Sequence, residues 1–305
     1  MKTAIVTGAT GFIGSWLLEK LIHEGVQVTA LVLEDEDFQF EPSIGSACKV
    51  VRYRPDLLLD LEDFDNGSDV FYNLGWGGVA PEQKNDLEIQ FANIRSSVDA
   101  VRFASKIGCA RFVGIGTASE YVYCDGLISS KEPPSPADFY GAAKVSARYM
   151  SKQLADMLGI GFIWTILPST FGPRRNDNNI VTYTIRTLLD GGCPSYTKLE
   201  QMWDFLYIED VVNALFLIGK KGVDGKFYGI GSGVHRPLRE YIESIRDAVN
   251  PDLPLGVGDR PYPQGTVPSS CIDANVLVAD TGFTPTFTFE EGIEKTIHYF
   301  KGKQK

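Results

Sequence analysis

Tyr140 and Lys144 stand four residues apart in the run Tyr140-Gly-Ala-Ala-Lys144. On a helix this spacing places a phenol and an ammonium one turn apart on the same face, where the ammonium would stabilise a phenolate and favour proton transfer. The spacing alone is a weak signal, because the 13 tyrosines give a second match, Tyr299 to Lys303, for which solvent exposure is expected. Thr117 distinguishes the first match, because it ends an apolar run, and doubly wound sheets place ligand sites at strand ends. The alternative for Thr117 is a hydroxyl that only caps the next turn.

A glycine-rich turn, Thr7-Gly8-Ala9-Thr10-Gly11-Phe12-Ile13-Gly14, follows the first apolar run and opens a helical pattern. This context predicts a dinucleotide-binding turn, although three glycines in an ordinary loop remain the alternative. Gly8 would permit the tight turn, Gly11 would let a pyrophosphate approach the backbone, and Gly14 would let helix and strand pack closely. The expected cofactor contacts in this turn are Gly8, Thr10, Gly11, Phe12, Ile13 and Gly14.

These residues require a βαβ framework to position them. Short, nearly continuous apolar runs predict strands of a parallel sheet covered on both faces, at Thr3 to Val6, Val26 to Leu33, Asp69 to Leu74, Arg111 to Ile115 and Phe162 to Leu167. Helical periodicity predicts helices from Leu87 to about Gly108 and over Asp138 to Leu158. We therefore expect an α/β fold of the Rossmann type, with a doubly wound parallel sheet and a smaller, loop-rich substrate-binding lobe.

Composition changes after residue 170, where Gly, Pro and Asn-rich loops separate shorter helices such as Ile208 to Ile218 and Leu238 to Val249. The expected organisation is an NAD(P)-binding Rossmann domain over residues 1–170, with a returning segment at about 206–231. Residues 171–305 would form mainly the substrate lobe. The two parts would interleave, because Lys226 to Ile230 still resembles a strand of the sheet.

The net charge of -10 disfavours nucleic acid and anionic membranes as partners. The five cysteines are far apart and odd in number, which argues against a disulfide framework and a zinc site and favours a reducing compartment. Nothing resembles a signal peptide, and no apolar run reaches the roughly 18 residues that a membrane span needs. The expected location is the cytoplasm, and no metal is expected.

Taken together, the glycine turn, Thr117 and the Tyr140/Lys144 pair resemble the extended short-chain dehydrogenase/reductases, and more narrowly the NAD-dependent epimerase/dehydratase family acting on nucleotide sugars. The likeness extends over nearly the whole chain. It includes Asn73-Leu74-Gly75, Gln90 to Asn93, Phe171-Gly172-Pro173, Trp203 to Asp210 and Tyr228 to Gly233.

The resemblance implies roles for individual residues. Tyr140 would be the acid/base, Lys144 would lower the pKa of Tyr140 and hold the nicotinamide ribose, and Thr117 would hydrogen-bond the reacting oxygen. Asn93 would brace the cofactor side, or else be an ordinary surface amide. The remaining implied cofactor contacts are Glu34, Asn73, Leu74, Gly75, Leu167 and Pro168.

The chain departs from the family pattern at several positions. Family dehydratases usually follow the threonine with an Asp-Glu pair, but this chain has Ala118 and Ser119, which disfavours a 4,6-dehydratase. Glu120 is one place too late and would point to the other side of an extended segment. Trp203 and Ser169 replace a frequent arginine and asparagine, so the grip on a diphosphate would need other residues. The expected substrate contacts are Ser119, Ser169, Arg174, Arg175, Trp203, Arg236 and Arg260, although each arginine can equally be a solvated surface charge.

The acidic run Glu34-Asp35-Glu36-Asp37 follows the second strand, and no Lys or Arg lies between Lys20 and Lys49. These carboxylates would repel a 2'-phosphate, which favours NAD over NADP. NADP stays possible, because Val32 and Leu33 occupy the diagnostic places and the run can be a solvated loop without a role.

The expected function is that of an NAD-dependent nucleotide-sugar epimerase, which transfers hydride reversibly at a ring carbon, C4, through a keto intermediate. The alternative is an NAD(P)H-dependent nucleotide-4-keto-sugar reductase of deoxysugar synthesis. A non-catalytic cofactor-binding regulator is the remote third. The family also implies a homodimer, formed through the helices that contain Asn93 and Tyr140.

Overall fold

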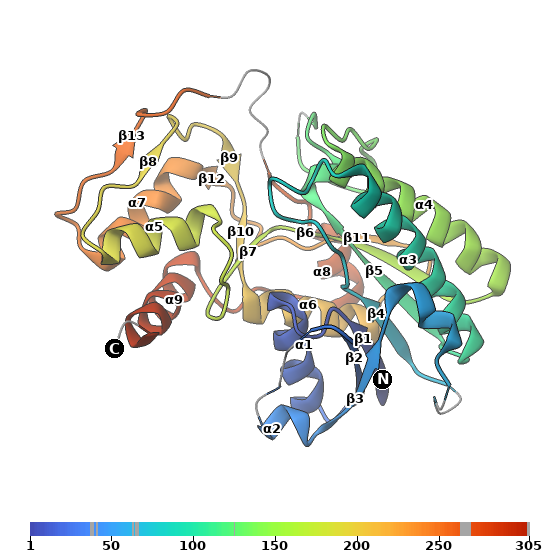
Figure 1. Cartoon of the computed structure of the whole chain (residues 1–305). Helices are drawn as coiled ribbons and strands as arrows, with labels where there is room; N and C mark the ends of the chain where they lie inside the picture. Colours follow the sequence, from blue (N-terminus) through green and yellow to red (C-terminus); the bar gives the residue numbers. More distant parts are fainter. Residues whose placement is uncertain are drawn as a thin grey trace.

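A seven-stranded parallel sheet lies at the centre of the larger lobe, in the order β11-β6-β5-β4-β1-β2-β3 (Figure 1). The computed structural model describes residues 1–36, 40, 42–62, 64, 67–124, 126–262 and 270–303. The strands are β1 (Thr3–Thr7), β2 (Gln27–Leu33), β3 (Cys48–Tyr53), β4 (Val70–Asn73), β5 (Arg111–Thr117), β6 (Gly161–Leu167) and β11 (Phe227–Gly229). The predicted fold class is confirmed.

Helices cover both faces of this sheet. Along β1, Ala4 and Val6 pack into one hydrophobic core and Ile5 into the other, because successive strand residues point to opposite faces. The first core includes residues of α1 (Phe12–His23) and α6 (Ile208–Lys221), and the second includes residues of α3 (Leu87–Lys106) and α4 (Phe139–Leu158). Three short helices flank the strands: α2 (Pro42–Gly45), η1 (Pro55–Asp60) and η2 (Ala118–Glu120).

The edge strand β3 was not predicted from the apolar runs of the sequence. Its residues include Lys49 and Arg52, and most of its side chains are exposed or half-buried. An edge strand lacks a neighbour on one side and tolerates charged residues, so it does not produce the apolar run of a central strand. β3 brings Arg52 opposite Val32 of β2, which places a cation beside the acidic run.

The second lobe is built mainly from short elements after β6. It contains α5 (Ile180–Leu189), α7 (Leu238–Val249) and α9 (Phe289–Lys303), which pack on one another. Three two-stranded sheets accompany these helices: β7 (Ser169–Phe171) with β10 (Phe205–Tyr207), β9 (Met202–Trp203) with β12 (Arg236–Pro237), and β8 (Ser195–Tyr196) with β13 (Gly256–Val257). By contrast, α8 (Asn275–Thr281) packs on α6 and β11, so the chain returns to the sheet domain twice after residue 205 (Figure 1).

All five cysteines are free thiols. Within the described ranges, no helix combines the length and the apolar character that crossing a bilayer would require. The same part of the chain holds no group of three or more His, Cys, Asp or Glu side chains suited to a metal ion.

Candidate active site

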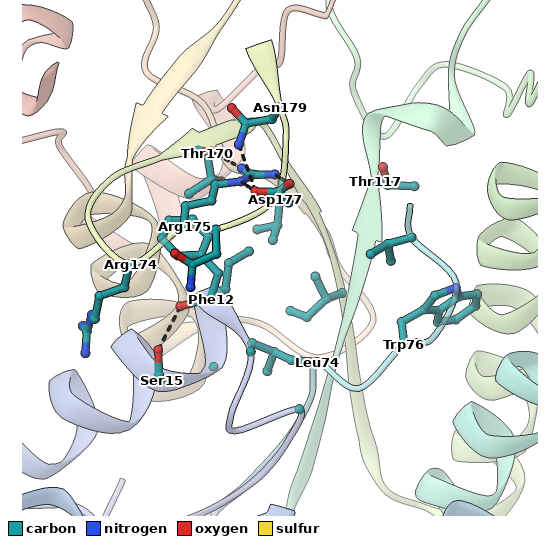
Figure 2. Close-up of a pocket in the computed structure, with 18 of the residues that line it drawn as sticks. Phe12, Ser15, Leu74, Trp76, Thr117, Thr170, Arg174, Arg175, Asp177 and Asn179 are labelled. Carbon is teal, nitrogen blue, oxygen red and sulfur yellow. Dashed lines mark hydrogen bonds and ion pairs between the residues drawn. The ribbon is translucent and has the colours of Figure 1, made fainter. Parts of the chain in front are cut away.

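A cleft of about 930 Å³ lies between the two lobes, at the carboxyl ends of β1, β5 and β6. One wall carries Thr117 and Trp76, and the other carries Arg175, Asp177 and Asn179 (Figure 2). The residues predicted from the sequence that line it are Gly8, Thr10, Gly11, Phe12, Ile13, Gly14, Leu74, Thr117, Tyr140, Lys144, Leu167, Pro168, Ser169, Arg174 and Arg175. The cleft thus gathers the glycine turn and the Thr117/Tyr140/Lys144 group in one space.

The glycine turn is held by close backbone contacts. Gly8 has φ +62, and a Cβ there would lie 2.8 Å from the amide nitrogen of Gly75. A Cβ on Gly14 would lie 2.0 Å from the carbonyl oxygen of Gly8, so Gly14 packs α1 against its own preceding turn. Gly11 is the N-cap of α1 and offers no side-chain cap, and no acid occupies the first helical turn. The free N–H groups at this helix end therefore suit the pyrophosphate of a dinucleotide.

The acidic run folds back onto the glycine turn through Glu36. The Thr10 hydroxyl donates a hydrogen bond to Glu36 Oε2 over 2.8 Å, whereas Glu34 is exposed and does not line the cleft. Arg52 donates to the carbonyl oxygens of Leu33 and Glu36, so a cation supports this loop from β3. Asp37 lies outside the described residues. The acid placed beside the turn is thus Glu36, which the sequence signalled only as a member of the run.

Three of the predicted cofactor contacts instead support the loop after β4. Asn73 Oδ1 accepts a hydrogen bond from the Thr7 hydroxyl (2.8 Å), and the same hydroxyl accepts one from the amide of Gly75 (3.1 Å). Asn93 donates to the carbonyl oxygen of Gly77 and accepts from its amide, both over 2.9 Å. None of these three predicted residues lines the cleft in the described structure.

The loop that Asn93 holds presents Trp76 to the active site. The Lys144 ammonium lies 3.8 Å from the centroid of the Trp76 ring, and the indole N–H donates to Gln90 Oε1 over 3.1 Å. Trp76 also meets the Tyr140 ring edge-on, with 6.2 Å between centroids. Sequence reasoning missed Trp76, although a bulky aromatic residue between Gly75 and Gly77 was a visible signal.

Helix α4 carries Tyr140 and Lys144 into the cleft. Asp138 caps the helix, accepting a hydrogen bond from the amide of Gly141 over 2.7 Å, and a left-handed Gly159 ends it. A Cβ on Gly141 would lie 2.3 Å from the Ser119 carbonyl oxygen, so glycine is needed to seat α4 against η2. This seating brings Tyr140 next to the end of β5, where Thr117 also accepts a hydrogen bond from the Ser119 amide and so caps the turn. The Ser119 side chain does not line the cleft in the described structure.

Burial dominates the electrostatics of this group. It raises the pKa of Tyr140 to about 12, with the Thr117 side chain acting in the opposite direction and the charges of Glu120 and Asp138 adding to the rise. Burial also lowers the pKa of Lys144, whose ammonium donates to the carbonyl oxygen of Ile115 over 2.7 Å. The protein alone therefore leaves Tyr140 protonated at neutral pH. A cationic nicotinamide beside the phenol would favour its ionisation.

Glu120 does not follow the extended path considered for it. Residues 118–120 form η2, and the Glu120 side chain turns back into the protein, where it is fully buried and does not reach the cleft. Tyr299 of the second Tyr/Lys match also differs from expectation, because it is half-buried and lines the cleft.

The two departures from the family pattern in the second lobe contact each other. The Trp203 indole N–H donates to the Ser169 hydroxyl over 2.9 Å. Ser169 lines the cleft, whereas Trp203 lies behind it. The indole N–H of Trp203 and the hydroxyl oxygen of Ser169 are therefore hydrogen-bonded to each other.

Three of the four predicted arginines are paired with acids. Arg174 binds Glu19, Arg175 binds Asp177, and Arg236 binds Glu290. Arg174 points away from the centre of the cleft in Figure 2. Arg260 differs, because within the described residues its guanidinium contacts the Ser195 hydroxyl (3.3 Å) and no carboxylate.

Arg260 lines a second hollow of about 400 Å³, next to Tyr183 and Tyr196. Asn179 and Ile180 line both hollows, so the second one adjoins the main cleft.

Comparison with known proteins agrees with this arrangement. The family described as NAD dependent epimerase/dehydratase matches residues 4–231. A dTDP-glucose 4,6-dehydratase of Escherichia coli is 31% identical over 188 residues, a match that spans 57% of this chain and 51% of that protein. The corresponding dehydratase of Neisseria meningitidis is 25% identical over 343 residues, covering 98% of this chain and 93% of its own. Among solved structures, a UDP-N-acetylglucosamine 4-epimerase from Methanobrevibacter ruminantium superposes with a TM-score of 0.87 at 21% identity, covering 99% of each chain.

A doubly wound sheet, a glycine turn at a helix N-terminus and a Tyr/Lys pair at the strand ends define a dinucleotide-dependent enzyme class. The chain belongs to the NAD dependent epimerase/dehydratase family. This membership confirms the family and the cofactor, NAD, that the sequence predicted.

Proposed function

We propose that this protein is an NAD-dependent nucleotide-sugar epimerase that inverts a hydroxyl-bearing ring carbon, C4, through a keto intermediate. The relatives and structural neighbours include both dehydratases and epimerases of nucleotide sugars. The choice between these reactions depends on which proton-carrying groups reach the substrate.

The observation that carries the proposal is that the described residues lining the cleft include no unpaired acid. Among the described residues that line it, the one carboxylate is Asp177, and Arg175 and Asn179 already bind it. Ala118 and Ser119 carry no acid, and Glu120 points into the protein. Loss of water from a sugar requires groups that remove and deliver protons beside the hydride site. The residues described in the cleft therefore favour oxidation and reduction at one carbon over dehydration, since they include no acid free for that step.

The residues of this chain provide the proton chemistry. Tyr140 would accept the proton of the sugar hydroxyl and return it later, while Thr117 would hold the reacting oxygen. The Lys144 ammonium would stabilise the phenolate and bind the nicotinamide ribose. NAD, when bound to the glycine turn and Lys144, would supply the hydride acceptor and donor. Since hydride is returned to the other face of the keto sugar, there is no net redox change.

The neighbouring hollow would hold the nucleotide end of the substrate. Arg260 forms no ion pair with any acid in the described part of the chain, and a guanidinium suits a phosphate. Tyr183 and Tyr196 supply aromatic surface in the same hollow. Such an anchor would keep the keto sugar bound while the sugar ring rotates to present its other face.

Preference for NAD over NADP would come from Glu36. Its carboxylate is held beside the glycine turn by Thr10 and would repel a 2'-phosphate. Arg52 lies close to the same loop and would weaken this repulsion, so the discrimination should be modest.

The reductase of nucleotide-4-keto sugars is the second candidate, because the Trp203–Ser169 pair leaves a different surface where the family often has an arginine and an asparagine. A non-catalytic regulator fits less well, since Thr117, Tyr140 and Lys144 are all retained. The homodimer expected from the family is also a proposal. Large apolar side chains are exposed on α3 and α4, among them Phe91 and Met157, the latter 76% exposed.

The test is incubation of the purified enzyme with UDP-, GDP-, CDP- and dTDP-sugars and with 4-keto sugars, following sugar identity by NMR and reduced cofactor by absorbance. Interconversion of two hydroxy sugars without net consumption of cofactor is expected. Stoichiometric oxidation of NADH or NADPH by a keto sugar, with no epimer formed from any hydroxy sugar, would assign the protein as the reductase.

A further inference from the structure

Glu120 is a buried acid directly behind the active site that the proposed chemistry does not use. It is 0% exposed, lies in η2 between Thr117 and Tyr121, and does not line the cleft. A carboxylate so far from water is costly unless its charge or its hydrogen bonds serve a purpose.

One oxygen of Glu120 fixes the end of β5. Oε1 accepts a hydrogen bond from the backbone amide of Thr117 (3.0 Å) and one from the Trp164 indole (3.3 Å). Gly116 makes this contact possible, because a Cβ there would lie 2.3 Å from Oε1. The other oxygen, Oε2, has no hydrogen-bond partner in the described part of the chain. Hydrogen bonds therefore compensate the burial of only one of the two carboxylate oxygens.

The charges that face Glu120 are two cations of α4, Lys144 and Arg148. Lys144 is buried and donates to the Ile115 carbonyl, and Arg148 donates to the Tyr121 hydroxyl over 2.7 Å. Neither forms a direct ion pair with a carboxylate in the described ranges. The other charged or titratable groups are Tyr121, Tyr140, Asp138 at the start of α4, and Lys84, whose ammonium lies 5.1 Å from the Tyr140 ring.

Burial acts on the two groups in opposite directions. It raises the pKa of Glu120 and lowers the pKa of Lys144, so burial disfavours the charged form of both groups. The negative charge of Glu120 opposes this for Lys144, and the positive charge of Lys144 opposes it for Glu120. Each charge therefore makes the other easier to keep inside the protein.

We propose that Glu120 is a positioning residue for the Thr117/Tyr140/Lys144 site: one oxygen fixes the backbone of Thr117, and the negative charge at this end of β5 stabilises the Lys144 ammonium, which is bound to the Ile115 carbonyl of the same strand. The substrate and cofactor never touch Glu120. Its effect reaches them through the two residues it controls.

Glu120→Gln separates the two parts of this role. Glutamine keeps a carbonyl oxygen that can accept the Thr117 and Trp164 hydrogen bonds, but it removes the charge. Without that charge, Lys144 and Tyr140 both lose protons more readily, so the pH profile of turnover should move to lower pH by about one unit. The matched control is Asp210→Asn, another buried acid, which accepts the amides of Thr286 and Phe287. It should leave the profile in place. A Glu120→Gln profile that superimposes on that of the wild type would overturn the proposal. This arm relies on the proposed function, because it needs a turnover assay.

A second experiment needs no substrate, so it tests the role of Glu120 independently of the proposed epimerase function. Melting temperatures are measured for the wild type, Glu120→Gln, Lys144→Met and the double variant. Lys144→Met should lower the melting temperature by removing one of the two cations that face Glu120, and adding Glu120→Gln should restore part of that loss. An equal effect of Glu120→Gln in both backgrounds, or failure of both proteins that carry Glu120→Gln to fold, would show that Glu120 only caps the turn.

Discussion

The hydroxyl of Tyr140 is the group on which the proposed chemistry depends most directly. Tyr140→Phe removes this hydroxyl and leaves the ring in place. The ring would keep its surroundings, which include the Trp76 ring, with 6.2 Å between the two centroids, and the Lys84 ammonium, 5.1 Å from the Tyr140 centroid. We therefore expect folding and NAD affinity to stay within a few-fold of the wild type, while turnover falls by roughly 100-fold or more.

The size of this effect follows from the burial of the phenol. With a pKa of about 12, Tyr140 would be ionised in roughly one molecule in 10,000 at pH 8 before cofactor binds. The ammonium of Lys144 and a cationic nicotinamide must supply the stabilisation that makes proton transfer fast. Phenylalanine leaves them no proton to move, so the whole contribution of a positioned acid/base is lost, which is typically 100- to 10,000-fold, in order of magnitude.

The assay is single-substrate conversion by whichever nucleotide sugar the enzyme accepts, together with titration of NAD by fluorescence. Tyr299→Phe is the matched control, because Tyr299 lines the same cleft and precedes Lys303 with the same spacing. It should convert substrate at nearly the wild-type rate. Turnover of Tyr140→Phe within a few-fold of wild type, with NAD affinity retained, would refute the assignment of Tyr140.

Three other predictions concern the cofactor, the substrate anchor and the assembly. Glu36→Gln removes the charge beside the glycine turn and should lower the ratio of the NADP to the NAD dissociation constant by several-fold, because a screened contact contributes about 1 kcal/mol or less. An unchanged ratio in calorimetric titrations would show that Glu36 does not face the ribose. Arg260→Ala should raise KM by roughly tenfold or more with a smaller change in kcat, since the anchor binds the phosphate in every state, and steady-state kinetics with a normal KM would place the diphosphate elsewhere. Phe91→Glu should convert a dimer to a monomer in light scattering, whereas a wild-type monomer would remove the basis for an α3/α4 interface.

The central fold could be predicted because it is encoded locally. Continuous apolar runs mark buried parallel strands, and the bounds expected for α7 and for the end of α4 agree with the structure. The edge strand β3 was missed for the opposite reason, since Lys49 and Arg52 interrupt its pattern. Helix α9 was also not predicted, although Phe289, Ile293, Ile297 and Phe300 bury one face.

The site shows a similar division between local and long-range information. The glycine turn and the Tyr140/Lys144 pair each lie within one short segment, so sequence spacing alone places them. Trp76 and the Trp203–Ser169 bond depend on segments brought together by the sheet, and no spacing rule connects them. The choice of Glu36 over Glu34 depends on how one loop folds against Thr10. Tertiary contacts of this kind require coordinates.

The bond between Trp203 and Ser169 makes two distant positions a single unit of evolutionary change. Replacing Trp203 by arginine would deprive the Ser169 hydroxyl of its donor, and replacing Ser169 by an apolar residue would leave the indole N–H without an acceptor. Either step alone is expected to lower stability or affinity before any new ligand contact can compensate. Evolution from this pair to the more frequent Arg/Asn pair would therefore pass through a less fit single-substitution intermediate, unless both residues change together. Libraries that vary Trp203 and Ser169 together should reach altered ligand preferences that one-site scanning cannot find.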